Sequence, residues 1–212
     1  MKRTFADRAD AAHRLAEALR ETITSSVIVL GIPRGGVVVS TIVARDLGAE
    51  HGVVVARKLR APTQPELAIG AVTASGSLCL DEDLAILSGA SPRYLAQERE
   101  LQIAEARRRE TAFGSHARPS VVGQTVIIVD DGLATGATAV AAVRAIRARH
   151  AAHVIFAVPV GPPHAVATLR QEADDVVCLL VDSAFRSVGQ YYDDFRQIED
   201  DEVMALLNDV GD

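Results

Sequence analysis

Two adjacent carboxylates and a glycine-bounded loop follow an apolar run in residues 126–138, VIIVDDGLATGAT. Carboxylate oxygens accept hydrogen bonds, so Asp130 and Asp131 suit a pair of neighbouring hydroxyl groups. Gly132 and Gly136 allow a tight turn whose backbone amide groups can point toward one anion. A ligand that carries hydroxyl groups beside an anion would satisfy both halves of this pattern.

The loop and the residues just after Gly136 also contain the donors that a phosphate requires. The hydroxyls of Thr135 and Thr138, with the free amide groups and the dipole of the following helix, suit the dianionic end of a monophosphate. Spacing excludes two other phosphate motifs: Ala137 stands where a Walker loop has lysine, and the interval from Gly132 to Gly136 is too long for a dinucleotide-binding turn. We therefore predict a sugar phosphate site. An ordinary strand-to-helix turn with a solvated acidic pair is the alternative.

A second glycine-rich turn, GIPRGG at residues 31–36, follows the apolar run VIVLG. Gly35 and Gly36 let backbone amides approach an oxyanion, and Arg34 offers a fork of donors that matches phosphate oxygens. Both glycine turns follow expected strands, and open parallel sheets bind ligands beyond the carboxyl ends of their strands. We therefore predict that the two turns share one site and that this turn binds pyrophosphate, although a tight turn without a ligand has the same pattern.

The rest of the chain supplies the elements that would position these turns. Apolar runs typical of buried strands alternate with amphipathic segments typical of helices, which predicts an α/β fold with a mostly parallel central sheet and flanking helices. The expected strands cover residues 27–31, 52–59, 125–129, 153–160 and 176–181. A first helix is expected directly after a cap at Asp7. Further helices are expected over residues 37–47, 91–113, 138–150, about 163–172 and 200–209.

Three segments stand apart from this alternation. Residues 60–66, RAPTQPE, contain two prolines and mostly polar residues, which predicts an exposed, mobile loop before a short hairpin of residues 67–72 and 77–80. A helical insertion is expected at about 82–114. Its main helix begins with Ser91 as cap and Pro92 at the first position, and is too charged for a core. We expect one domain over residues 1–212.

Composition excludes several classes of function. The net charge of -6 argues against a general nucleic-acid binder, because affinity for the phosphate backbone comes from clustered lysine and arginine. No run approaches the roughly 18 apolar residues of a membrane span, and we expect a cytoplasmic protein. Cys79 and Cys178 are far apart, and the apolar run around Cys178 predicts a buried thiol. The six histidines have no metal-ligand spacing.

Together, VIIVDDGLATGAT and GIPRGG resemble the phosphoribosyl pyrophosphate loop and the pyrophosphate loop of type I phosphoribosyltransferases. From FADRA to VGQYYDDF the chain resembles a bacterial phosphoribosyltransferase-like subgroup without a defined acceptor. The resemblance implies that Asp130 and Asp131 hold the ribose hydroxyls, that Mg²⁺ is held mainly by the substrate, and that the protein is a homodimer. It also implies a non-proline cis peptide near Arg34. The residues implied to hold the 5-phosphate are Gly132, Leu133, Ala134, Thr135, Gly136, Ala137 and Thr138.

The same resemblance assigns a lid and a hood. The loop 60–66 would close over the reacting centre, with Lys58 contacting pyrophosphate or acceptor; solvated charges at Arg57 and Lys58 are the alternative. The hood would comprise about residues 185–212. Its segment FRSVGQYYDDF resembles the base-binding segment of hypoxanthine-guanine enzymes, which slightly favours a purine. In that hood Phe185, Val188 and Tyr191 would flank the base and Asp193 would approach the metal; ordinary packing and surface groups are the alternative.

The reaction implied is displacement at the anomeric carbon of phosphoribosyl pyrophosphate by a nitrogen of an acceptor base. Asp130, Asp131 and Arg34 would be the catalytic residues: the carboxylates favour positive charge on the sugar, and the guanidinium neutralises the leaving pyrophosphate. A binding-only regulator on the same fold and phosphatase-like or phosphorolytic chemistry are the alternatives. We further expect the substrate, and not the protein, to be the main partner of Asp130 and Asp131.

Overall fold

The computed structural model of the chain describes residues 4–23, 25–65, 67–117 and 119–209. Its main sheet has the strand order β2-β1-β6-β7-β8, and all neighbouring strands are parallel. The strands are β1 (Val27–Gly31), β2 (Glu50–Val53), β6 (Thr125–Val129), β7 (His153–Gly161) and β8 (Asp175–Val181). This sheet confirms the predicted α/β fold.

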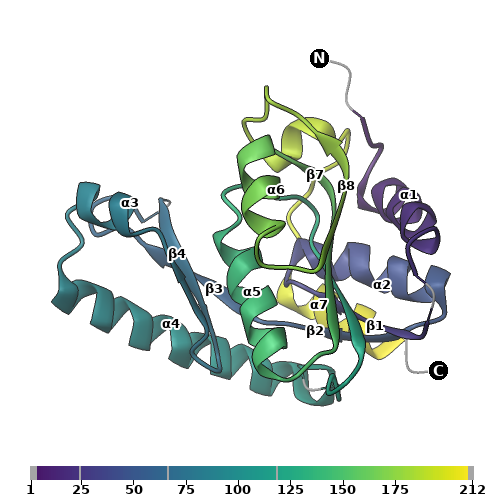
Figure 1. Cartoon of the computed structure of the whole chain (residues 1–212), viewed down its shortest axis with the longest axis horizontal. Helices are drawn as coiled ribbons and strands as arrows, with labels where there is room; N and C mark the ends of the chain where they lie inside the picture. Colours follow the sequence, from purple (N-terminus) through teal and green to yellow (C-terminus); the bar gives the residue numbers. More distant parts are fainter. Residues whose placement is uncertain (1–3, 24, 66, 118, 210–212) are drawn as a thin grey trace.

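Helices cover both faces of the main sheet (Figure 1). Apolar side chains of α1 and α2 pack on one face, and those of α5 and α6 pack on the other. Successive strand residues point to opposite faces, so Ile127 lies in the first cluster and its neighbour Ile128 in the second. No described helix is long and apolar enough to cross a membrane. The four helices are α1 (Arg8–Arg20), α2 (Gly35–Leu47), α5 (Ala137–Ala148) and α6 (Pro163–Leu169).

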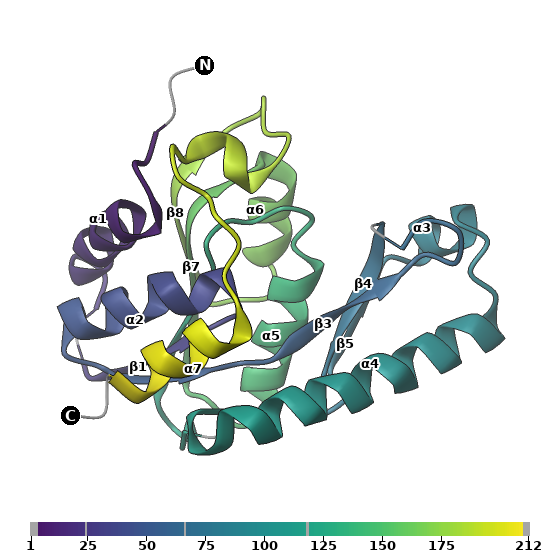
Figure 2. The same cartoon turned by 180° about the vertical axis from the view of Figure 1, so that it is seen from behind.

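A second, antiparallel sheet and two helices form an arm that projects from the main sheet (Figure 2). The predicted hairpin is present as β4 and β5, and α4 runs along this sheet. The arm consists of β3 (Ala56–Arg60), β4 (Ala68–Thr73), β5 (Leu78–Leu80), α3 (Glu82–Leu87) and α4 (Pro92–Phe113). The remaining elements are α7 (Asp200–Asp209) and the short helices η1 (Gly114–Ala117) and η2 (Val188–Tyr191).

The helix boundaries follow the capping residues that the sequence indicates. Asp7 accepts a hydrogen bond from the amide of Ala9 at 2.8 Å, and Ser91 accepts one from the amide of Tyr94 at 3.2 Å. Gly48 ends α2 in the left-handed conformation, with φ of 63°. Asp7 and Ser91 thus pair with amide groups that have no partner within their helices. Gly48 allows the backbone to leave the helix.

One predicted strand is wrong in its extent. Residues 52–59 were expected to form one strand, but β2 ends at Val53 and β3 begins at Ala56 in the other sheet. The residues between them, Val54 and Val55, are buried in two different apolar clusters. A continuous apolar run carries no signal for such a transfer between sheets, because both halves are equally apolar.

The helix α4 is less solvated than its charge suggests. Glu98 and Gln102 are buried, and Glu98 Oε1 accepts hydrogen bonds from Arg60 Nε at 2.9 Å and from Gln102 Nε2 at 3.1 Å. The burial of these polar groups is tolerated because their partners satisfy them. α4 also contributes Ala106 and Phe113 to a buried apolar cluster, so its packed side combines paired polar groups with apolar ones. The expectation that this helix is too charged for a core is therefore wrong.

Both cysteines are free and partly buried. Burial raises the pKa of the Cys178 thiol to about 11, so this thiol stays protonated at neutral pH. This agrees with the buried thiol predicted from the apolar run around it.

His51 on β2 is held as a neutral imidazole. Its Nε2 lies 2.8 Å from Ser40 Oγ, and that hydroxyl lies 3.1 Å from the carbonyl oxygen of Val37. Because Ser40 donates its only proton to Val37, His51 donates from Nε2, and its buried Nδ1 has no partner among the described residues. Burial, with a smaller contribution from His116, lowers the pKa of His51 to about 4.

Acidification is therefore expected to destabilise the fold through His51. A pKa lowered in the folded state gives stability that is complete above the ordinary value of 6.5 and is lost as the pH falls toward 4. One pKa unit corresponds to about 1.4 kcal/mol, so the loss approaches about 3 kcal/mol. Urea unfolding of the wild type and His51→Gln across this range measures it. The variant should lose less stability on acidification; equal losses would assign the effect to other groups.

Candidate active site

A cavity of about 420 Å³ lies where the sequence predicts the site, beyond the carboxyl ends of β1 and β6. It unites residues from the two glycine turns, from β3 and from the loop after β3. The residues that line it are Ile32, Pro33, Arg34, Gly35, Ala56, Arg57, Lys58, Arg60, Pro65, Asp130, Asp131 and Thr138. Positively charged and acidic side chains therefore face one open cavity.

The two glycine turns are in direct contact with each other. An added Cβ at Gly35 would lie 1.9 Å from Asp131 Oδ2, and one at Gly36 would lie 2.9 Å from Asp130 Oδ1. These positions therefore require glycine because the acidic pair packs against the start of α2. The peptide bond between Pro33 and Arg34 is cis, as the resemblance implied.

Asp130 faces the cavity with few protein partners. Its Oδ1 accepts a hydrogen bond from the amide of Asp131 at 2.8 Å. Burial, followed by the negative charge of Asp131, raises its pKa well above the usual value, and Lys58 opposes this rise. Among the described residues no cation forms an ion pair with Asp130, which leaves it ready for a ligand that donates hydrogen bonds.

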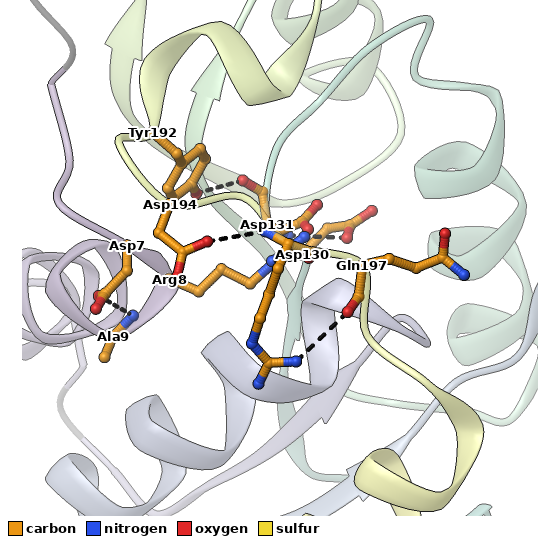
Figure 3. Close-up of polar contacts among 9 residues, drawn as sticks. Asp7, Arg8, Ala9, Asp130, Asp131, Tyr192, Asp194 and Gln197 are labelled. Carbon is orange, nitrogen blue, oxygen red and sulfur yellow. Dashed lines mark hydrogen bonds and ion pairs between the residues drawn. The ribbon is translucent and has the colours of Figure 1, made fainter.

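Asp131, in contrast, is bound by the protein on two sides (Figure 3). Arg8 Nε donates to Asp131 Oδ2 at 2.8 Å, and the hydroxyl of Tyr192 donates to the carbonyl oxygen of Asp131 at 2.6 Å. Burial raises the pKa of Asp131, and the charge of Arg8 lowers it in part. The expectation that the substrate, and not the protein, is the main partner of both carboxylates therefore needs correction for Asp131, because Arg8 already binds its side chain.

The predicted phosphate loop forms the turn between β6 and α5. Gly136 has φ of 83° and is the N-cap of α5, and Thr138 lines the cavity. Ala134 and Thr135 are exposed, so their amides and the Thr135 hydroxyl can be reached by a ligand. Leu133 anchors the loop instead: its side chain is buried and its amide donates to the carbonyl oxygen of Val160 at 2.8 Å.

Gly132 and Ala137 complete this loop. Gly132 is buried, and an added Cβ there would lie 2.4 Å from Val188 Cγ1. Ala137 is the first residue of α5, where amide groups have no partner within the helix. The start of α5 and the exposed part of the loop therefore lie where the sequence predicts the phosphate cradle, and of residues 132–138 it is Thr138 that lines the cavity. Phosphate binding by this loop stays a prediction.

Two of the cationic side chains around the cavity, Lys58 and Arg34, are held loosely. Lys58 is exposed on β3 and faces the cavity. Arg34 Nη1 lies 3.4 Å from Glu199 Oε2 and 3.9 Å from Asp200 Oδ1, at the start of α7. Exposed ion pairs of this kind contribute about 1 kcal/mol or less, so Arg34 can turn to an incoming anion at small cost.

The loop after β3 borders the cavity through Pro65. Its base is closed by a hydrogen bond from the amide of Ala61 to the carbonyl oxygen of Leu67 at 2.9 Å. This is the position that the predicted lid requires; its mobility stays a prediction.

The predicted acceptor residues lie together, outside the set that lines the cavity. Phe185 stacks on Tyr191 with ring centroids 5.7 Å apart, and the Tyr191 hydroxyl donates to Asp182 Oδ2 at 2.7 Å. Tyr191 is buried, whereas Phe185 and Val188 are partly exposed. Asp193 is exposed, and its amide donates to the carbonyl oxygen of Phe5. Because Tyr191 is buried and stacked on Phe185, its ring offers little surface for a base. The metal role of Asp193 stays a prediction.

Two residues that contact Asp131, Arg8 and Tyr192, were not predicted from the sequence. Arg8 is separated from Asp131 by 123 positions, and no local periodicity links them. One weak signal existed: a cation in the first turn of a helix opposes the helix dipole, which suggests another partner. Tyr192 lies within the segment FRSVGQYYDDF, but nothing in that segment indicates a contact with Asp131, which is 61 positions away.

Comparison with known proteins agrees with this geometry. Residues 5–196 match the phosphoribosyl transferase domain, and the chain therefore belongs to that family. "Putative phosphoribosyl transferase Rv0571c" of Mycobacterium tuberculosis (strain ATCC 25618 / H37Rv) is 42% identical over 205 residues, which are 96% of this chain and 46% of that protein. The chain thus spans about half the length of the curated relatives it matches.

Two solved structures share the fold. The crystal structure of TT1426 from Thermus thermophilus has 42% identity and a TM-score of 0.81, with 97% of this chain and 98% of that chain covered. The AQ2163 protein from Aquifex aeolicus has 13% identity and a TM-score of 0.51, with 82% and 73% covered. The first similarity extends to the sequence, and the second concerns the fold alone.

Proposed function

We propose that this protein transfers the phosphoribosyl group of phosphoribosyl pyrophosphate to a nitrogen of an acceptor base, with a purine preferred. The observation that carries the proposal is the single cavity that joins the acidic pair, the start of α5, the Pro33–Gly35 turn and Lys58. Groups that can donate hydrogen bonds to an anion lie on both sides of the two carboxylates, which can accept hydrogen bonds from hydroxyl groups. This arrangement matches a sugar with a phosphate at one end and a pyrophosphate at the other.

One placement of the substrate would satisfy these groups. The 5-phosphate binds the exposed part of the loop before α5, where amides and the hydroxyls of Thr135 and Thr138 donate. The ribose hydroxyls donate to Asp130 and to the oxygen of Asp131 that Arg8 leaves free. The pyrophosphate lies over the turn at Arg34, within reach of cationic side chains. This placement leaves the anomeric carbon facing the acceptor.

The reaction then needs positioning and charge stabilisation. A lone pair on the acceptor nitrogen forms the new bond to the anomeric carbon as the bond to the pyrophosphate oxygen breaks, and the electron pair leaves with pyrophosphate. The acceptor base gives up its N–H proton, which passes to the released pyrophosphate or to solvent. Positive charge develops on the sugar, which Asp130 and Asp131 stabilise, while Arg34 and Lys58 stabilise the leaving group. The loop after β3, closed over the cavity, excludes water from the reacting carbon.

The proposed Mg²⁺ fits this donor set as an ion held mainly by the substrate. No group of three or more His, Cys, Asp or Glu residues that could hold a metal occurs in the described part of the chain. Mg²⁺ keeps several waters and is commonly bound through substrate phosphates, so it needs few protein ligands. When bound, the ion would neutralise charge on the pyrophosphate.

Phosphoribosyl pyrophosphate with Mg²⁺ is expected to stabilise the folded protein, because the ligand binds only the native site. At about 100 times the dissociation constant the gain is about 2.7 kcal/mol, which for a chain of this size raises the melting temperature by roughly 5 to 10 °C. Thermal unfolding with and without the ligand measures this shift, with Mg²⁺ alone as control. An unchanged melting temperature at millimolar ligand would contradict the proposed site.

Turnover is tested by pyrophosphate release with a panel of purines, pyrimidines and pyridine carboxylates. Release that depends on a purine supports the proposal, since the segment 185–195 resembles a purine-binding hood. Saturable binding without release for any base would favour a regulator that binds phosphoribosyl pyrophosphate. Release without any base would indicate hydrolysis.

A further inference from the structure

Arg8 is a buried arginine in the first turn of α1, and its guanidinium is held from several directions. Its side chain is 9% exposed. In addition to the bond from Nε to Asp131 Oδ2, its Nη1 donates to the carbonyl oxygen of Arg196 at 2.9 Å. Two donors of one planar group thus bind a site residue and the C-terminal segment at the same time.

Packing fixes the plane of this guanidinium as well. Its central carbon lies 3.9 Å from the ring centroid of Phe195. An added Cβ at Gly35 would lie only 3.1 Å from Arg8 Nε. Immobilising a long side chain costs conformational entropy, and a cation near a helix N-terminus is unfavourable for that helix. The stability of α1 therefore gives no reason for an arginine at this position.

The contact with Asp131 has a direct consequence for the site. Arg8 binds Oδ2, so the orientation of the carboxylate is set and Oδ1 is the oxygen left for a ligand. The Tyr192 hydroxyl fixes the backbone of the same residue. Arg8 itself lies behind Asp131, because the residues that line the cavity include Asp131 and omit Arg8. Arg8 therefore acts on a ligand through Asp131.

We propose that Arg8 is a positioning residue that orients the Asp131 carboxylate toward the ribose and keeps it ionised beside Asp130. This inference rests on the proposed function and extends it to α1 and to the segment 192–196. The groups that face Asp131 are Arg8, the carboxyl of Asp130 and the hydroxyl of Tyr192, and Arg8 is the cation among them. The position of the C-terminal segment is thereby tied to the phosphoribosyl site.

Three variants separate this role from a general structural one. Arg8→Gln removes the charge and the fork of donors, whereas Arg8→Lys keeps the charge and loses the fork. Arg14→Gln is the matched control: Arg14 lies on the same helix, 4.7 Å from the ring of Phe5, and donates to the carbonyl oxygen of Thr4, without a contact to Asp131. Affinity for phosphoribosyl pyrophosphate with Mg²⁺ is measured across pH for each variant.

Arg8→Gln is expected to bind at least about 10-fold more weakly, because a misplaced carboxylate no longer meets the ribose hydroxyl. The pH at which binding is lost on acidification, here called the acid limb, should move up by about one unit in this variant. The reason is that an adjacent cation lowers a carboxyl pKa by that amount or more. Arg8→Lys should keep the wild-type acid limb but bind more weakly. Arg14→Gln should match the wild type in both measurements.

Carbon-13 NMR titration of Asp131 in the free protein gives a second measurement that needs no ligand. Its titration should move to higher pH in Arg8→Gln and stay unchanged in Arg14→Gln. If the wild type binds phosphoribosyl pyrophosphate and Arg8→Gln binds it with the same affinity and the same acid limb, the positioning role is overturned and the proposed function stands. A wild type that binds no phosphoribosyl pyrophosphate would overturn the proposed function and, with it, this role.

Discussion

Asp130→Asn and Asp131→Asn are each expected to lower turnover by about 100-fold or more and to weaken the binding of phosphoribosyl pyrophosphate by about 1.5 to 3 kcal/mol. Asparagine keeps one acceptor oxygen and the size of the side chain. It removes the charge that strengthens the bonds to the ribose hydroxyls and that stabilises positive charge on the sugar. Both carboxylates face the same cavity, so both substitutions should affect the same ligand.

The two variants should differ in the stability of the free protein. A carboxyl pKa that is raised in the folded state means that ionisation opposes folding, and this cost grows as the pH rises through the folded pKa. Asp130→Asn removes that cost and should stabilise the protein at neutral pH. At Asp131 the same gain is opposed by the loss of charge beside Arg8, so Asp131→Asn should be less stable than Asp130→Asn by about 2 kcal/mol.

Pyrophosphate release, ligand affinity and urea unfolding of the wild type and both variants test this expectation. Asp10→Asn is a suitable control, because Asp10 is an exposed carboxylate on α1 that accepts a hydrogen bond from the amide of Ala6. Normal affinity in either site variant would remove that carboxylate from the ribose site. Equal free energies of unfolding for the two variants would show that the ion pair between Arg8 and Asp131 does not stabilise the folded protein.

Local signals in the sequence were sufficient for most helices and strands. Asp7 and Ser91 mark helix starts because their oxygens pair with free amides, and Gly48 marks an end because it adopts a left-handed conformation. The strand of residues 125–129 is bounded by its own apolar run. The two glycine turns could be placed together because parallel strands present their carboxyl ends at one edge.

Features that depend on distant partners could not be predicted in the same way. The polar face of α4 is buried only because Arg60 of β3 supplies a partner for Glu98, 38 positions away. In isolation, Glu98 reads as a surface residue, since buried glutamate is rare without a partner. The transfer of the chain from β2 to β3 is likewise decided by which cores receive Val54 and Val55.

The candidate site shows the same division between local and distant information. Residue types and spacing were enough to propose Asp130, Asp131 and Gly35, because the chemistry of a sugar phosphate needs acceptors beside a bare backbone. The partner of Asp131 comes from α1 and could be found only once both were placed in space. The sequence therefore indicates which groups line the cavity better than which groups hold them in place.

Gly35→Ala is expected to reduce the binding of phosphoribosyl pyrophosphate by about 100-fold or more. The added methyl group would lie 1.9 Å from Asp131 Oδ2, and 3.1 Å from Arg8 Nε. No real contact is that short, so the Asp131 carboxylate must turn away from its position between α2 and the ribose. A displacement of about 1 Å in a positioning group can cost a factor of 100.

The stability of the same variant separates this clash from a backbone effect. Alanine has a higher helix propensity than glycine by about 1 kcal/mol, so without a clash Gly35→Ala should stabilise α2. With the clash, we expect a loss of about 1 to 3 kcal/mol, the usual cost of overpacking. A double-mutant cycle with Asp131→Ala isolates the cause, because removal of the carboxylate opens the space that the methyl group needs. Gly35→Ala should then destabilise the wild type and not Asp131→Ala; additive losses would show that the methyl group acts elsewhere.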